Sequence, residues 1–121
     1  MKKSLKISAI IIIQVLFLTV FGFSQTQSLT GKQTKGVANK NAELKCVPVT
    51  FTQAVKITAV SGTNEGFWIE MEGYTKPIYN FYTANDPKAI NVILKPGKYW
   101  VYPNIKTGSN EATVVLTIAN L

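Results

Sequence analysis

The sequence predicts an all-β fold, an antiparallel β-sandwich of jelly-roll or immunoglobulin-like type with about six to seven strands. Three observations support this fold class. Apolar and polar residues alternate with a period of two over most of residues 42–121. Turn-forming residues recur about every 8–12 positions, and no segment has the periodicity of a helix of about ten residues or more. Residues 42–121 are therefore expected to form one domain.

The first predicted strand covers residues 44–51 and contains a proline. Because Pro48 cannot donate a ladder hydrogen bond, we expect this strand at a sheet edge or bulged at that point. Cys46 is the only cysteine, so the domain has no internal disulfide. We expect it to be a small buried residue on the inward side of the strand, with an intermolecular disulfide as the alternative.

Two hairpins are predicted farther along the chain. Residues 55–59 are expected to pair with residues 67–72, and residues 90–94 with residues 98–102 across a proline–glycine turn. Further strands are expected at residues 78–83 and 113–118. The side chains predicted to form the core are Ile57, Ile69, Leu94, Val114 and Leu116.

The C-terminal strands carry a family resemblance. Residues 90–101, INVILKPGKYWV, followed after a turn by residues 112–118, ATVVLTI, resemble the closing strands of small bacterial secreted β-sandwich modules such as the bacterial pre-peptidase C-terminal domain. Residues 50–59 resemble its opening strands. This resemblance implies a non-catalytic accessory domain of the kind usually attached to an enzyme. That family carries aspartates where this chain has NEG at residues 64–66, so a calcium-linked role does not carry over.

Residues 1–24 have the three parts of a secretory signal peptide. Three lysines lie within the first six residues, residues 7–23 are mostly apolar, and small residues at positions 22 and 24 precede a cleavage site before Gln25. An uncleaved membrane anchor is the alternative, because the apolar run is at the short limit of the roughly 17–25 residues that cross a bilayer. Both interpretations place the rest of the chain outside the cytoplasm. We expect a secreted, periplasmic or cell-surface protein, without stable membrane insertion after cleavage.

Residues 25–41 are predicted to be a flexible tether between the signal peptide and the domain. The segment reads QTQSLTGKQTKGVANKN and is polar and glycine-containing. Its apolar residues, Leu29, Val37 and Ala38, are too few to order it by burial.

The charged residues argue against several functions. All 13 basic residues are lysines, and three of them lie in the signal peptide, so against six acidic residues the remaining chain has a net charge of +4. Without arginine, bidentate contacts with guanine or phosphate are not available, and no nucleic-acid partner is expected. Without histidine, the commonest general base and zinc ligand are missing. We therefore expect no enzymatic activity and no cofactor.

The aromatic residues supply the candidate binding site. If their apolar neighbours face the core, Trp68, Trp100 and Tyr102 must face outward. Outward rings on a sheet can stack on sugars or anchor a protein, and Glu70 and Lys98 could hydrogen-bond at the rim. The alternative is that the rings cover an open sheet edge. The expected function is therefore a binding module for a glycan or a protein partner, with a structural or assembly subunit of a surface complex as the alternative.

The carboxylates are weaker candidates. Glu70 and Glu72 share a strand face at a spacing of about 7 Å, which an inverting glycosidase would allow. Such same-strand pairs are usually solvated, and the small domain leaves little room for a cleft. A calcium site formed by these residues with Asp86 would lack a recognisable loop motif.

Export is testable on the native protein. We expect the mature chain to begin at Gln25, because the small residues before it suit signal-peptide cleavage. N-terminal sequencing and intact mass measure this directly. A soluble cytosolic protein that still begins at Met1 would contradict the prediction.

Overall fold

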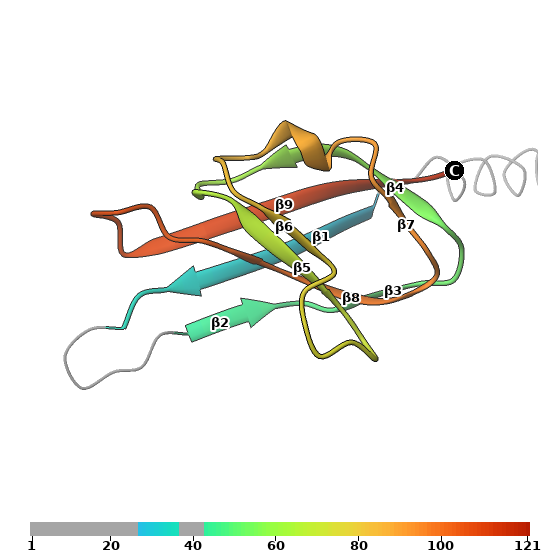
Figure 1. The fold of residues 1–121 in the computed structure, drawn as a ribbon, viewed down its shortest axis with the longest axis horizontal. Coiled ribbons are helices and arrows are strands. Elements are labelled where there is room, and N and C mark those ends of the chain that lie inside the picture. Colours follow the sequence, from blue (N-terminus) through green and yellow to red (C-terminus); the bar gives the residue numbers. More distant parts are fainter. Residues whose placement is uncertain (1–26, 37–42) are drawn as a thin grey trace, which may run out of the picture.

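The computed structural model describes residues 27–36 and 43–121, and their nine strands form two antiparallel sheets (Figure 1). One sheet comprises β2 (Glu43–Cys46), β1 (Gln27–Thr34), β9 (Glu111–Asn120), β4 (Val55–Ser61) and β7 (Ile93–Leu94), in that spatial order. The other comprises β3 (Val49–Phe51), β8 (Gly97–Pro103), β5 (Phe67–Met71) and β6 (Tyr79–Phe81), also in spatial order. The predicted all-β fold with two packed antiparallel sheets is confirmed.

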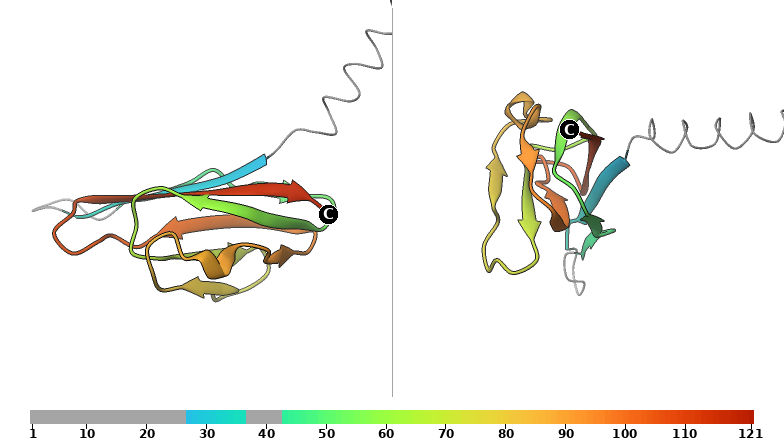
Figure 2. Two further views of the ribbon diagram at one scale, coloured as in Figure 1. Left: turned by 90° about the horizontal axis from the view of Figure 1, so that it is seen from above. Right: turned by 90° about the vertical axis from the view of Figure 1, so that its right-hand side faces the viewer.

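The two sheets pack face to face as two layers (Figure 2). The apolar side chains between them form the core. Alternation places every second residue of the long strands in this interior. Burying one such side chain stabilises the fold by about 1.5–3 kcal/mol. All five side chains predicted for the core are at most 1% exposed: Ile57, Ile69, Leu94, Val114 and Leu116.

Strand β1 corrects the prediction of a flexible tether. Residues 27–34 form a strand that lies between β2 and β9 and pairs with both. Leu29 lies opposite Leu116 and is completely buried. The tether prediction was therefore wrong for this strand. The other parts of residues 25–41 lie outside the described residues, except for the two that follow β1, and the predicted signal peptide lies wholly outside them.

A glycine explains why β1 lacks the expected apolar alternation. Gly31 faces the second sheet, where a Cβ atom would collide with the carbonyl oxygen of Val101 in β8. The backbone of β8 therefore occupies the space that an apolar side chain of β1 would fill. One buried leucine and this close backbone contact fix the strand, so a largely polar sequence lies in the interior of a sheet.

The two predicted hairpins are also wrong, because in each the chain crosses from one sheet to the other. Strands β4 and β5 lie in different sheets, and so do β7 and β8. β4 pairs instead with β7 and β9, while β5 pairs with β6 and β8. Each connection is an arch over the end of the core. The apolar face of each strand then meets the apolar face of the opposite sheet.

The side chain of Asn64 holds the arch between β4 and β5. It is only 5% exposed. Its amide nitrogen donates to the side-chain oxygen of Asn85 at 2.8 Å and to the carbonyl of Thr113 at 2.9 Å. Its oxygen accepts from the backbone N–H groups of Gly66 at 3.1 Å and Asn85 at 3.0 Å. This buried amide is fully hydrogen-bonded, and it joins the arch to β9 and to the loop after β6.

The predicted first strand is divided between the sheets. β2 ends at Cys46, β3 begins at Val49, and the residues between them, including Pro48, carry the chain from the first sheet to the second. The proline therefore marks the crossover rather than a bulge, and the predicted edge position is confirmed, because β2 and β3 each lie at one edge of their sheet. A bulge does occur in β4 between Ile57 and Ala59, and it leaves Ala59 exposed although Ile57, two positions earlier, is buried.

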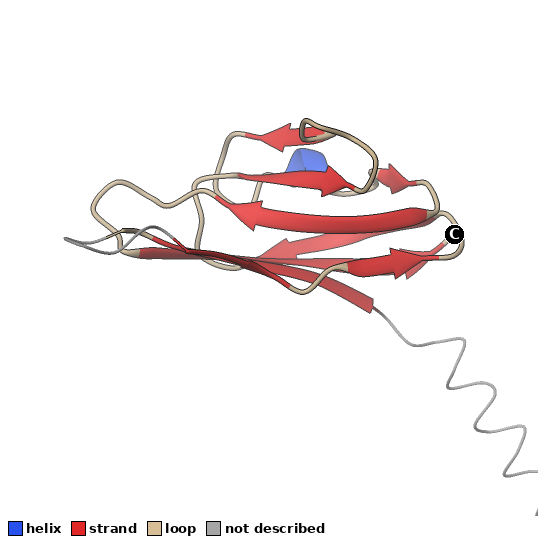
Figure 3. Ribbon diagram, turned by 90° about the horizontal axis from the view of Figure 1, so that it is seen from below, coloured by secondary structure: helices blue, strands red, loops and turns tan. Residues whose placement is uncertain are grey.

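The predicted strand at residues 90–94 is reduced to the two residues of β7. A short 3₁₀ turn, η1 (Pro87–Ala89), precedes it (Figure 3). The carboxylate of Asp86 caps this turn by accepting from the backbone N–H of Lys88 at 3.0 Å. Asn91 has a φ of 73°, which interrupts extended geometry. Over residues 27–36 and 43–121, no helix has the length and apolarity to cross a bilayer.

The role of β1 can be tested with Leu29→Ala. We expect the free energy of unfolding to fall by about 2–5 kcal/mol, because truncating a fully buried leucine leaves a cavity. Urea denaturation measures the change. Thr30→Ala is the matched control on the exposed side of β1 and should change stability by no more than about 0.5 kcal/mol. Equal, small effects of both variants would contradict the position of β1 in the sheet.

Candidate functional site

The outer surface of the second sheet brings all five predicted site residues together. In the pairing of β5 with β8, Trp68 lies opposite Tyr102, and Glu70 lies opposite Trp100. Their neighbours along each strand are buried in the core, so these side chains point outward. We call this surface the aromatic face; it comprises Trp68, Glu70, Lys98, Trp100 and Tyr102. Each of the five is half-buried rather than fully exposed.

Contacts within the aromatic face account for the half-burial. The rings of Trp68 and Tyr102 are 5.5 Å apart between centroids and inclined at 41°. The indole N–H of Trp68 donates to the carboxylate of Glu70 at 3.1 Å. The ammonium of Lys98 lies 5.8 Å from the ring centroid of Trp100. The rings of Trp68 and Tyr102 and the carboxylate of Glu70 therefore have defined contacts before any ligand binds, which lowers the entropic cost of binding.

A depression of about 360 Å³ opens beside the aromatic face. Its walls include Glu70, Trp100 and Tyr102, together with Glu72 and Tyr74, which were not predicted as site residues. Glu72 had been considered only as one of the weaker carboxylate candidates, although alternation places it on the same strand face as Glu70. Tyr74 follows β5 in the connection to β6, and no periodicity predicts where a side chain in such a loop lies.

The charges in the depression are mostly solvated. The ammonium of Lys98 lies 3.8 Å from the carboxylate of Glu72, and both side chains are substantially exposed, so this ion pair contributes little stability. The pKa of Tyr102 is raised, chiefly by burial and secondarily by the nearby Cys46 and Glu70. Its hydroxyl is therefore protonated at neutral pH and can donate a hydrogen bond as well as accept one.

Cys46 lies next to this sheet but has a structural role. Its Sγ accepts a hydrogen bond from the backbone N–H of Val101 at 3.4 Å. Val101 lies beyond the part of β8 that pairs with β3, which extends only as far as Tyr99. The residue is half-buried and packs against the core, whereas the sequence predicted a buried side chain. Burial raises the pKa of its thiol, an effect that Glu70 increases and the hydrogen bond from Val101 opposes. This environment disfavours the reactive thiolate.

The carboxylates do not gather into a metal site. Among the residues that the structure describes, no group of three or more histidine, cysteine, aspartate or glutamate side chains could hold a metal ion. Asp86 is engaged at η1, where the hydrogen bond from the Lys88 backbone, with smaller contributions from neighbouring groups, lowers its pKa. The three carboxylates considered for calcium therefore form no metal-binding cluster.

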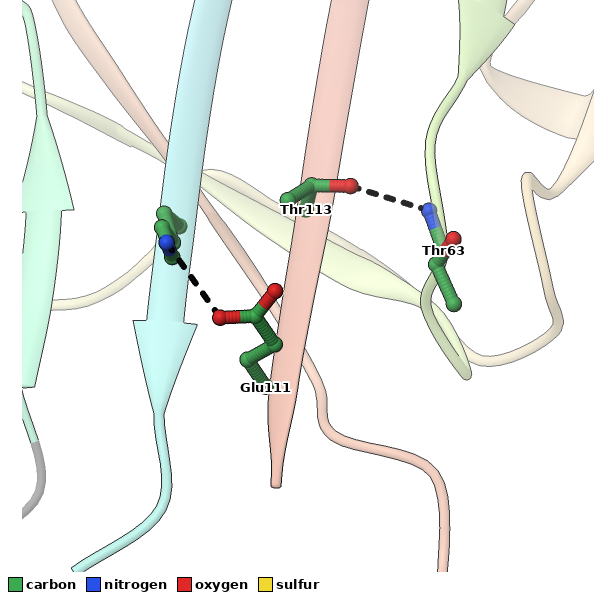
Figure 4. Close-up of polar contacts among 4 residues, drawn as sticks. Thr63, Glu111 and Thr113 are labelled. Atoms are coloured by element: carbon green, nitrogen blue, oxygen red, sulfur yellow. Dashed lines mark hydrogen bonds and ion pairs between the residues drawn. The ribbon is translucent and has the colours of Figure 1, made fainter. Parts of the chain in front are cut away.

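The outer surface of the first sheet differs in character, as a close-up of part of it shows (Figure 4). The ammonium of Lys32 in β1 lies 3.3 Å from the carboxylate of Glu111 in β9. The hydroxyl of Thr113 accepts a hydrogen bond from the backbone N–H of Thr63 at 3.1 Å. These polar groups bind one another across neighbouring segments. The aromatic face, with its large rings and depression, is therefore the stronger candidate for ligand binding.

Comparison with family models, curated proteins and solved structures finds no match to this chain. The resemblance to the pre-peptidase C-terminal domain therefore stays a prediction from the sequence.

The environment of Cys46 predicts slow thiol chemistry. At pH 8 we expect iodoacetamide to alkylate the folded protein more slowly than the urea-unfolded chain, because burial raises the thiol pKa above its ordinary value of 9.0. Mass spectrometry measures the rate of alkylation. Alkylation as fast as in the unfolded chain would contradict this environment for Cys46.

The raised pKa of Cys46 also predicts a pH dependence of stability. Above about pH 9 the unfolded state loses a thiol proton that the folded state keeps, so the free energy of unfolding should decline as pH rises.

Proposed function

We propose that this protein is a non-catalytic binding module that acts outside the cytoplasm and binds a glycan on the aromatic face. The observation that carries the proposal is the depression in which the rings of Trp100 and Tyr102 adjoin the carboxylates of Glu70 and Glu72. A site that combines apolar rings with a few convergent polar groups is typical of ligand recognition.

The chemistry of these groups suits a sugar. A pyranose presents C–H groups on its faces, which pack on aromatic rings, and hydroxyls at its edge, which need hydrogen-bond partners. The carboxylates of Glu70 and Glu72 can accept from such hydroxyls, and the protonated hydroxyl of Tyr102 can donate or accept. The hydrogen bond from Trp68 holds the Glu70 carboxylate in place. The proposed site therefore offers both kinds of contact that a sugar requires.

The proposed affinity is low. Aromatic contacts contribute about 0.5–1.5 kcal/mol each beyond area burial, and the depression offers only a few of them. We expect dissociation constants on the order of millimolar for a short oligosaccharide. A glycan with repeated sugars would bind more tightly to protein displayed in many copies, because linked contacts raise the effective concentration.

The second candidate is a structural or assembly subunit of a surface complex. The observation that favours it is the half-burial of the aromatic face, whose rings partly cover one another. Tyrosine and tryptophan are also enriched where proteins bind each other. In that case the ligand of the same surface would be a protein rather than a sugar.

The glycan proposal is tested by a glycan array, followed by NMR titration of the best ligand. Trp100→Ala should weaken binding at least about tenfold, because it removes a wall of the depression. Tyr79→Ala is the matched control, since this partly exposed tyrosine is not among the residues that line the depression. It should leave glycan affinity unchanged, and both variants should keep near-normal melting temperatures.

Unchanged glycan affinity in Trp100→Ala would place the sugar elsewhere and contradict the proposal. If the array shows no glycan and a pull-down shows a protein partner that Trp100→Ala releases, the assembly role replaces it.

A further inference from the structure

A second cavity lies at the open side of the sandwich, between the connection from β5 to β6 and the strand β7. Its volume is about 390 Å³, within the roughly 300–1,000 Å³ range of small-molecule sites. Its floor is made by buried core side chains, Met71, Leu94 and Tyr99. The strands beside this cavity are short, because β6 has three residues and β7 only two.

The rim of this cavity gathers exposed apolar side chains. Tyr74, Tyr79 and Ile93 are 51%, 36% and 55% exposed. They are three of the seven large hydrophobic side chains that are exposed among the described residues. Isolated exposed apolar residues are ordinary, but several around one hollow mark a binding site. Together with the floor, they offer a ligand a lining that is mostly apolar.

The rim of the cavity carries one charged side chain. Lys95 is the single charged residue that lines the cavity in the described part of the chain. Its ammonium lies 2.8 Å from the hydroxyl of Tyr74 and 5.2 Å from the centroid of that ring, so the closer contact is a hydrogen bond to the hydroxyl. The Lys95 carbonyl accepts from the hydroxyl of Tyr99 at 2.6 Å, which fixes the backbone that carries the ammonium.

We propose that this cavity binds an apolar monocarboxylate such as a medium-chain fatty acid. The hydrocarbon part would displace water from the apolar side chains of Ile78, Tyr79 and Ile93. The carboxylate would accept charge-assisted hydrogen bonds from the ammonium of Lys95 and from the hydroxyl of Tyr74. With no carboxylate lining the cavity in the described residues, the rim favours an anion. This site is independent of the glycan proposal, although Tyr74 adjoins both cavities.

The experiment compares decanoate with decan-1-ol, which has the same chain without the charge, by NMR titration of the purified protein. We expect both to bind saturably, with decanoate the tighter ligand. Lys95→Met should weaken decanoate about tenfold and leave decan-1-ol nearly unchanged, because only the charge-assisted contact is lost. Lys106→Met is the matched control and should leave the affinity for decanoate unchanged. It removes an exposed lysine from the connection between β8 and β9. This connection lies at the opposite end of the sandwich from β7 (Figure 1).

Ile93→Asp tests the position of the site. It places a charge at an exposed rim position on a short edge strand, so the domain should still fold, and both ligands should bind at least tenfold more weakly. Trp100→Ala should leave decanoate affinity unchanged, which separates this site from the glycan site. Absence of saturable binding, or binding that Ile93→Asp does not weaken, would overturn the cavity as the site. Equal decanoate affinity in wild type and Lys95→Met would overturn the carboxylate as the recognised group.

Discussion

The close contact between Gly31 and the backbone of Val101 determines how the two sheets of this domain pack. Any side chain at that position of β1 would collide with the Val101 carbonyl and push the sheets apart. Because the interior is packed at the density of a crystal, such a shift would also loosen contacts that depend on the same spacing. Leu29, two residues before the glycine, reaches the core because β1 lies so close to β8. The position of β1 inside its sheet therefore depends on glycine, which has no side chain, at residue 31.

The arches between the sheets explain why the core and the aromatic face are two sides of the same strands. Since β4 and β5 belong to opposite layers, the apolar face of each is buried against the other layer. In β5 the buried Ile69 is followed by Glu70, and in β8 the buried Val101 lies between Trp100 and Tyr102. The packing that stabilises the fold thus also holds the rings of the aromatic face in register. The buried amide of Asn64 adds a specific polar link that keeps the first arch in place.

The two proposed sites reflect two ways in which a small sandwich can offer a ligand surface. On the outside of the second sheet, the rings and the carboxylate of Glu70 lie on regular strands, beside neighbours in the ladder. At the other site, the short strands β6 and β7 border a cavity rimmed by exposed apolar side chains, and the loop that carries Tyr74 borders both sites. A polar ligand with apolar faces suits the first surface, and an apolar ligand with one charge suits the second.

The sequence by itself determined which faces of most strands are buried, because alternation is a local property of the extended chain. It correctly predicted the two-layered all-β fold, the five core residues from Ile57 to Leu116, and a common outward surface for Trp68, Trp100 and Tyr102. Only the tertiary structure decided which strands pair. The predicted hairpins became arches because apolar burial between layers governs pairing, and this depends on residues far apart in the chain. The sequence did not predict β1, because at Gly31 the backbone of β8 occupies the space that an apolar side chain would otherwise fill. It did not predict the cavity at Lys95, because loops and short edge strands form that cavity.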